Sequence, residues 1–175
     1  MIMPPGKPLL LPANPWFIWG SLLVALVLNM LLSIGWGRLF WSPDLLALTL
    51  VFWNVHQPQR IGVGAAFSFG LMMDVQQTTL LGQHALAYAI LGYLAVSVHR
   101  RLLWFSVPIQ TLHVLPLFFL AHILVSTLRL LMGGHFPEWN FFLTPVFTAA
   151  FWPVATLVLL VPQRRPHDPD VHRPL

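Results

Sequence analysis

The sequence predicts an all-α membrane protein, a polytopic bundle of six transmembrane helices, on three observations. Hydrophobic residues make up 57% of the 175 residues and charged residues only 8%, whereas a soluble domain carries about 25% charged residues. Apolar stretches recur between residues 16 and 161, and the mean hydropathy is +0.75. We therefore expect a transmembrane domain over residues 16–161. A cytoplasmic segment (1–15) would precede it, and a polar, proline-rich, disordered cytoplasmic tail (162–175) would follow.

The six expected spans are separated by polar, glycine-rich or proline-containing turns. They cover about residues 16–35, 39–56, 61–75, 84–98, 109–132 and 139–161. A straight crossing needs about 20 residues, so the short second, third and fourth spans suggest local thinning or partial insertion. Pro43 fits the first turn of the second span. Pro116, Pro145 and Pro153 lie inside later spans, where proline can kink a membrane helix.

The distribution of basic residues predicts the orientation, since cytoplasmic loops are enriched in Lys and Arg. Seven of the nine fall on one side and two on the other. The first set is Lys7, Arg60, Arg100, Arg101, Arg164, Arg165 and Arg173, and the second is Arg38 and Arg129. Both termini are therefore expected in the cytoplasm, with Asp74, Arg129 and Glu138 toward the outer face. The same count explains the net charge of +4 without nucleic-acid binding.

A run of small residues ends in a carboxylate. Gly62, Ala66, Gly70 and Asp74 recur every four residues, which places them along one face of a helix. Small residues at this spacing let membrane helices approach closely. Two interpretations stay open: packing within the bundle, or docking of a partner's single span.

Asp74 itself has several candidate roles, because an ionisable group in a membrane helix seldom faces lipid. It could bond neighbouring backbone near the outer surface, line a partner interface or polar pocket, or move an ion. Arg129 is its candidate partner. Asn29 and Asn54 are expected to donate interhelical hydrogen bonds. His84 is expected in an outer loop.

The sequence offers no catalytic or metal-binding constellation. It lacks zinc-protease, nucleophile-elbow and phosphate-loop motifs, and no span carries paired acids. With no cysteine, disulfides and thiolate metal sites are excluded. His113 and His122, nine residues apart, fall on opposite faces of one helix, and His167 and His172 lie in the tail. We expect no enzyme activity, no cofactor and no metal.

An ordered series of residues resembles the rod shape-determining protein MreD family. It comprises Pro43-Asp-Leu-Leu-Ala-Leu, Phe52-Trp53, Pro58-x-Arg60, Gly62, Phe67, Gly70-Leu-Met-Met-Asp74, Leu81-Gly82, Ala85-Leu86-Ala87-Tyr88 and Trp152-Pro153.

The resemblance implies a non-enzymatic component of the peptidoglycan elongation machinery in the bacterial inner membrane. The implied partners are the single-span protein MreC, the actin-like MreB, the glycosyltransferase RodA and a class B penicillin-binding protein. The implied fold is similar to the substrate-binding subunit of energy-coupling-factor transporters. Membrane lipids are a further expected contact. Independently of the resemblance, the candidates for partner binding or helix packing are Gly62, Ala66, Gly70, Asp74, Arg60 and Arg129. The alternative function is a transporter subunit that captures a small molecule, and an intramembrane enzyme is a third hypothesis.

Overall fold

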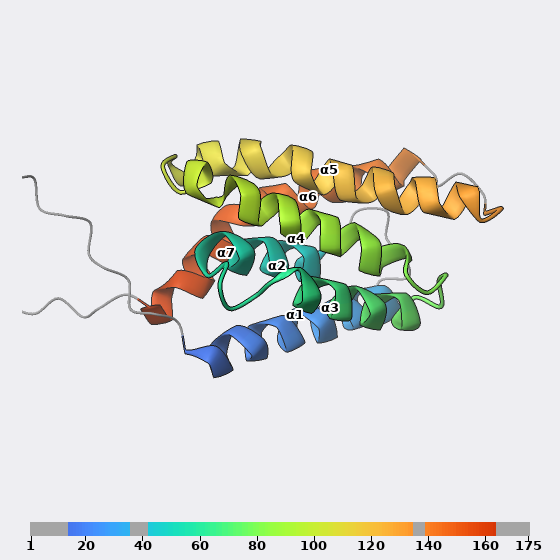
Figure 1. Ribbon diagram of the computed structural model, residues 1–175, viewed down its shortest axis with the longest axis horizontal. Coiled ribbons are helices and arrows are strands. Elements are labelled where there is room, and N and C mark those ends of the chain that lie inside the picture. Colours follow the sequence, from blue (N-terminus) through green and yellow to red (C-terminus); the bar gives the residue numbers. More distant parts are fainter. Residues whose placement is uncertain (1–13, 36–41, 135–138, 164–175) are drawn as a thin grey trace, which may run out of the picture.

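The computed structural model describes residues 14–35, 42–134 and 139–163, and over these residues it contains helices and no strands. Figure 1 shows the helices side by side with their long axes roughly aligned. The α-helices are α1 (Pro15–Gly35), α2 (Leu45–His56), α3 (Val63–Gln76), α4 (Gln83–Leu102), α5 (Val107–Leu131), α6 (Thr144–Ala150) and α7 (Trp152–Leu160). Two short 3₁₀ segments, η1 (Trp139–Leu143) and η2 (Val161–Gln163), flank the last pair. The predicted all-helical class is confirmed.

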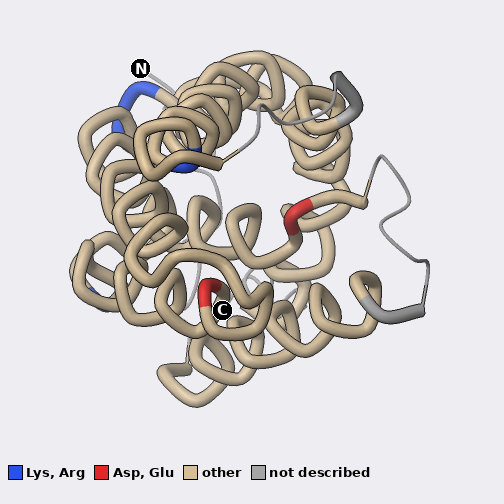
Figure 2. Tube along the Cα trace, turned by 90° about the vertical axis from the view of Figure 1, so that its right-hand side faces the viewer, with Lys and Arg blue, Asp and Glu red and all other residues tan. Residues whose placement is uncertain are grey.

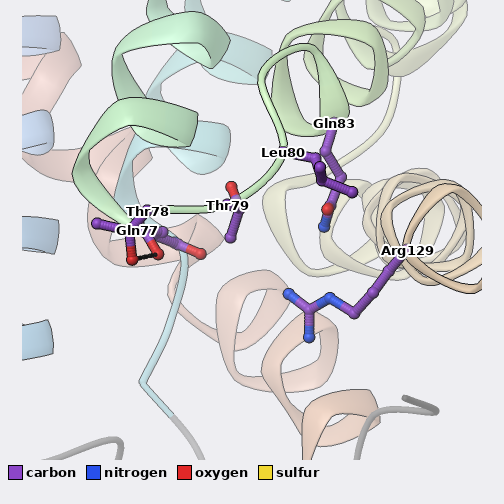
Figure 3. A pocket seen from close by; sticks show the side chains of 6 residues that line it. All are labelled: Gln77, Thr78, Thr79, Leu80, Gln83 and Arg129. Atoms are coloured by element: carbon purple, nitrogen blue, oxygen red, sulfur yellow. Dashed lines mark hydrogen bonds between the residues drawn. The ribbon is translucent and has the colours of Figure 1, made fainter. Parts of the chain in front are cut away.

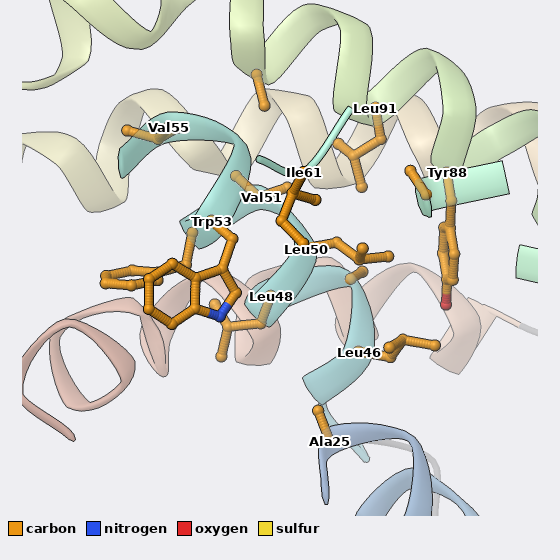
Figure 4. Close-up of a cluster of buried hydrophobic side chains, with 14 of the residues drawn as sticks. Ala25, Leu46, Leu48, Leu50, Val51, Trp53, Val55, Ile61, Tyr88 and Leu91 are labelled. Carbon is orange, nitrogen blue, oxygen red and sulfur yellow. The ribbon is translucent and has the colours of Figure 1, made fainter. Parts of the chain in front are cut away.

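Helix α2 is the centre of the bundle. Every residue from Leu46 to Val55 is buried, so this helix is apolar all round, as expected for one surrounded by others. It contacts α1, α4, α6 and α7. Its tryptophan, Trp53, is fully buried, and the indole N–H donates to the Ser21 hydroxyl of α1 at 2.8 Å. Figure 4 shows the apolar side chains that gather around this helix.

Short turns connect α2 to α3, α3 to α4 and α4 to α5, so successive helices run in opposite directions (Figure 1). One end of the bundle therefore holds the α3–α4 turn and the C-terminus of α5; we call it the α3–α4 end. The other end holds the α2–α3 and α4–α5 turns. Arg60, Arg100 and Arg101 lie at this other end, and Arg129 lies at the α3–α4 end. The opposed placement that the sequence predicts for these four cations is therefore confirmed, whereas their orientation in a membrane stays a prediction.

Helices α3 and α4 form a close antiparallel pair, and Gly70 is the reason they can. A Cβ atom on Gly70 would lie 2.4 Å from the Cα atom of Ala85 and 2.7 Å from the carbonyl oxygen of His84. Both are backbone atoms, so no side-chain movement could relieve the clash. Further along the pair, Gly92 of α4 faces the side chains of Ala66 and Asn54. Small residues on both helices thus set their separation.

The last expected span is broken in two. The segments Phe141–Ala150 and Trp152–Gln163 meet at an angle of 42°. Pro153 lies in the first turn of α7; it has no N–H to donate to the carbonyl four residues earlier, so the helix cannot continue regularly. Pro116, by contrast, lies within α5, which is a single helix.

Some expectations need correction. Pro43 does not lie in the first turn of α2, because Asp44 is the N-cap and the helix begins at Leu45. Helix α4 is longer than expected and includes Gln83 and the residues up to Leu102. By length and apolar composition, two described helices could cross a membrane, Pro15–Ser33 and Val107–Leu131, or three if the bent pair is one span. Six crossings therefore stay a prediction.

Several expectations concern residues outside the described ranges. They include the N-terminal segment, most of the tail with His167 and His172, the start of the second expected span, and the residues Lys7, Arg38, Glu138, Arg164, Arg165 and Arg173.

The glycine contact gives a first prediction. Gly70→Ala should lower the free energy of unfolding by about 2 kcal/mol, because its methyl group must push the two helix backbones apart. Gly64→Ala is the matched control on the same helix, since a Cβ there meets no atom within 4 Å; its stability should be unchanged or slightly higher. Thermal unfolding of the purified protein in detergent measures both, and equal effects would contradict the assigned contact.

Candidate functional site: two capping carboxylates and an adjoining pocket

The described residues include two carboxylate side chains, Asp44 and Asp74. Figure 2, which views the bundle from the α3–α4 end, shows both acidic positions among the helices. Each lies at a helix terminus, and each accepts hydrogen bonds from the start of a helix. A helix start leaves several backbone N–H groups without an acceptor. The two carboxylates therefore supply acceptors where the bundle interior would otherwise lack them.

Asp74, in the last turn of α3, caps the start of α4. Its carboxylate accepts the backbone N–H groups of Gly82 at 2.8 Å, His84 at 2.8 Å and Ala85 at 3.3 Å. It also accepts the Thr79 hydroxyl at 3.3 Å and Nδ1–H of His84 at 2.8 Å. Asp74 is fully buried, so five donors and the positive end of the α4 dipole replace the water it lacks.

The turn between α3 and α4 is shaped for this contact. Gly82 is the N-cap of α4 and has φ +100°, a left-handed conformation that glycine adopts without strain. This conformation turns the chain so that its N–H faces Asp74. Gly70, one turn before Asp74, lets α4 lie close enough for the carboxylate to reach past its first residue. The glycine spacing and the carboxylate thus serve one helix–helix junction.

Asp44 caps the central helix α2 and joins it to three other helices. Its carboxylate accepts from the backbone N–H of Ala47 at 3.0 Å, the side-chain amide of Asn29 (α1) at 2.9 Å and the hydroxyl of Tyr88 (α4) at 2.5 Å. Its own N–H donates to the Thr148 hydroxyl of α6 at 2.9 Å. The side-chain oxygen of Asn29 also accepts the N–H of Leu45 at 3.0 Å, so the Asn29 amide acts both as a donor and as an acceptor.

The two capping sites meet on α4. His84 contacts Asp74 and Tyr88 contacts Asp44, and these residues lie one helical turn apart, with their rings edge to face and the centroids 5.9 Å apart. We call the set Asp44, Asp74, His84 and Tyr88, with Asn29 and Thr148, the polar network. It connects α1, α2, α3, α4 and α6 through side chains that are buried or partly buried.

A pocket of about 320 Å³ adjoins the network at the α3–α4 end. It is lined by Gln77, Thr78, Thr79, Leu80, Gln83 and Arg129. Figure 3 shows the Arg129 guanidinium extending from α5 toward the space below Thr79 and Gln83. Thr79 lies between the pocket and the polar network, because it lines the pocket and its hydroxyl donates to Asp74.

The structure places the candidate residues differently from one another. Ala66 and Gly70 pack against α4. Gly62 precedes α3 as its N-cap and is exposed, so it does not continue their face. Arg60 is exposed in the α2–α3 turn.

Three expectations about polar residues were wrong. Arg129 is not the partner of Asp74; its guanidinium lies 6.0 Å from the centroid of Phe141, and His84 takes the expected place. His84 lies in the first turn of α4, where it is buried, and not in the expected outer loop. Asn54 donates within its own helix, to the carbonyl of Leu50, whereas Asn29 makes the expected interhelical bond.

Sequence reasoning missed the role of Asp44 and Tyr88. The signal for Asp44 was present, since an aspartate directly before an apolar run is a typical N-cap. Tyr88 gave no local signal, because its partner lies 44 residues away in the sequence.

Residues 12–161 match the protein family described as rod shape-determining protein MreD. The chain belongs to the MreD family. This membership gives the protein a role in determining rod cell shape, and the apolar helices fit a transmembrane protein. No solved structure matches this MreD chain, so the similarity to energy-coupling-factor subunits stays a prediction. The matched region contains every member of the polar network and every residue that lines the pocket.

The Asp74 cap gives a second prediction. Asp74→Asn should lower the free energy of unfolding by about 3 kcal/mol, because an amide has one acceptor oxygen and turns N–H groups toward backbone donors. Thr79→Val removes the two long hydroxyl contacts with Asp74, to the carboxylate at 3.3 Å and to the main-chain carbonyl at 3.4 Å, and should cost less than about 1 kcal/mol. Chemical unfolding in mixed micelles compares the two, and equal losses would contradict the cap.

Tyr88 and Tyr93 give a third prediction, because the chain's two tyrosines lie on the same helix. Tyr88→Phe removes a donor from the Asp44 carboxylate and should cost about 2 kcal/mol of unfolding free energy. Tyr93 is 63% exposed, and Tyr93→Phe should change stability by less than about 0.5 kcal/mol. Chemical unfolding compares the two variants. A larger loss of unfolding free energy in Tyr93→Phe than in Tyr88→Phe would show that the polar network does not hold α4 in place.

Proposed function

We propose that this MreD chain is a non-enzymatic scaffold of the peptidoglycan elongation machinery. It would cross the bacterial inner membrane six times with both termini in the cytoplasm. In this proposal it holds the membrane span of an MreC-type protein, and MreB-type filaments, a RodA-type glycosyltransferase and a class B penicillin-binding protein assemble around the same complex.

The observation that carries a scaffold role is the use of the two described carboxylates. An acid–base or nucleophilic mechanism needs side chains free to exchange protons with a substrate. Asp74 is enclosed by five donors, and Asp44 accepts three hydrogen bonds while capping the central helix. Both groups hold helices together, which suits a rigid platform for other proteins.

The outward face of α3 is the surface we assign to the partner's span. Ala66 and Gly70 are taken up by α4, so the small residues open to a partner are Gly64 and Ser68, four residues apart and exposed. A Cβ on Gly64 would meet no atom within 4 Å. The Ser68 hydroxyl donates to the Gly64 carbonyl of its own helix at 3.0 Å. Burying this hydroxyl against a partner's helix therefore leaves no donor unsatisfied. Small residues at this spacing favour close packing between membrane helices.

The fourth prediction concerns this surface. Gly64→Leu and Ser68→Leu should each reduce copurification of an MreC-type partner by about fivefold or more, equivalent to about 1 kcal/mol, because the added side chains hold the helices apart. Their thermal unfolding without partner should match the unmodified protein.

Gly20→Leu on α1 is the matched control, since a Cβ at Gly20 also meets open space. This variant should retain the partner. Loss of the partner in Gly20→Leu with retention in Gly64→Leu would move the interface to α1. Full copurification in all three variants would contradict docking on either helix.

A further inference from the structure

A cation and an unpartnered amide meet in the pocket at the α3–α4 end. Gln83 is 4% exposed, and its Nε2 group is buried without a hydrogen-bond acceptor. Leaving a buried donor without an acceptor is unfavourable. Gln83 and Arg129 both line the same cavity of about 320 Å³, and Figure 3 shows their polar ends converging. The pocket therefore presents donors for which the described residues supply no acceptor.

Arg129 has no carboxylate partner among the described residues. Asp74 is engaged by His84 and backbone N–H groups, and Asp44 belongs to the other cap. The guanidinium instead lies over the Phe141 ring, 6.0 Å from its centroid. Such a contact leaves the in-plane N–H groups of arginine free to donate. An arginine fork and an amide N–H₂ together match an oxyanion with several acceptor oxygens, above all a phosphate group.

The surroundings of the pocket are apolar on the outside. Leu80 lines the cavity and is 49% exposed, and its neighbour Leu81 is 72% exposed. Two and three residues after Arg129, Leu131 and Met132 are also largely exposed. A cationic pocket at one end of an apolar bundle, bordered by exposed leucines, suits a molecule with a charged head and an acyl chain.

We infer that this pocket binds the phosphate group of a membrane phospholipid, with Arg129 and the Gln83 amide as donors. The acyl chains would then lie along the exposed apolar side chains beside the pocket. This inference does not depend on the identity of any protein partner, and it assigns a use to a buried donor that packing leaves unsatisfied.

The test measures lipid binding to the full-length protein in a neutral maltoside detergent. Native mass spectrometry with titrated phosphatidylglycerol gives the dissociation constant, and Arg129→Gln should weaken it about tenfold or more, as expected for loss of charge-assisted hydrogen bonds. Arg100→Gln removes one positive charge from the exposed last turn of α4, at the other end of the bundle, and should leave binding unchanged. Equal weakening in both variants would mean general charge attraction and would overturn the site.

Gln83→Leu separates binding from folding. It removes the donor and also the cost of leaving that donor unpaired, so phosphatidylglycerol should bind about threefold to tenfold more weakly while stability in lipid-free detergent stays the same or rises. Unchanged binding in Gln83→Leu would exclude Gln83 from the site. Lower lipid-free stability with unchanged binding would assign it a purely structural role and overturn the inference.

Two further ligands distinguish the source of the phosphate. Glycerol 3-phosphate carries the head without chains, and diacylglycerol carries the chains without phosphate. A much higher affinity for phosphatidylglycerol than for glycerol 3-phosphate supports a lipid site. Equal affinities for the two ligands support the phosphate contact, but with a soluble phosphate compound as the natural ligand. Equal binding of diacylglycerol overturns the phosphate contact.

Discussion

The start of a helix inside a membrane protein needs acceptors for its first N–H groups, and this requirement organises the bundle. Water cannot supply acceptors in the apolar interior. In this MreD chain Asp44 supplies them for α2, and Asp74 supplies them for α4. Because both carboxylates also accept side-chain donors from other segments, satisfying the helix starts fixes the positions of neighbouring helices.

The consequences differ at the two sites. At Asp74 the cap is local in sequence: it joins α3 to the helix that follows directly, and Gly70 and Gly82 provide the close approach and the turn. At Asp44 the cap is distant: it brings together Asn29, Tyr88 and Thr148, the last of them 104 residues from Asp44. The central apolar helix α2 is thereby held in register by polar contacts at its start and by packing along its length. A bundle held in this way presents fixed outer surfaces, which is what the scaffold role we propose requires.

The sequence allowed the local features to be predicted and left the distant ones open. The apolar stretches predicted the helices, and Pro153 predicted a kink in the last span, where the chain bends by 42°. The four-residue spacing of Ala66 and Gly70 indicated a packed face, but not that α4 occupies it. Arg129 was an attractive partner for Asp74 by charge and side of the membrane. His84 is the actual partner, because the α3–α4 turn brings both its backbone N–H and its ring to the carboxylate. The spacing of these residues in the sequence does not reveal this double contact.

The most direct measurement of the capping account is residue-resolved hydrogen exchange on the unmodified protein in a lipid bilayer. If Asp74 closes the start of α4, the amides of Gly82, His84 and Ala85 should exchange as slowly as amides in the middle of that helix, although a helix start ordinarily has no internal acceptor. Exchange at these three amides as fast as at the exposed Leu81 in the preceding turn would contradict the account.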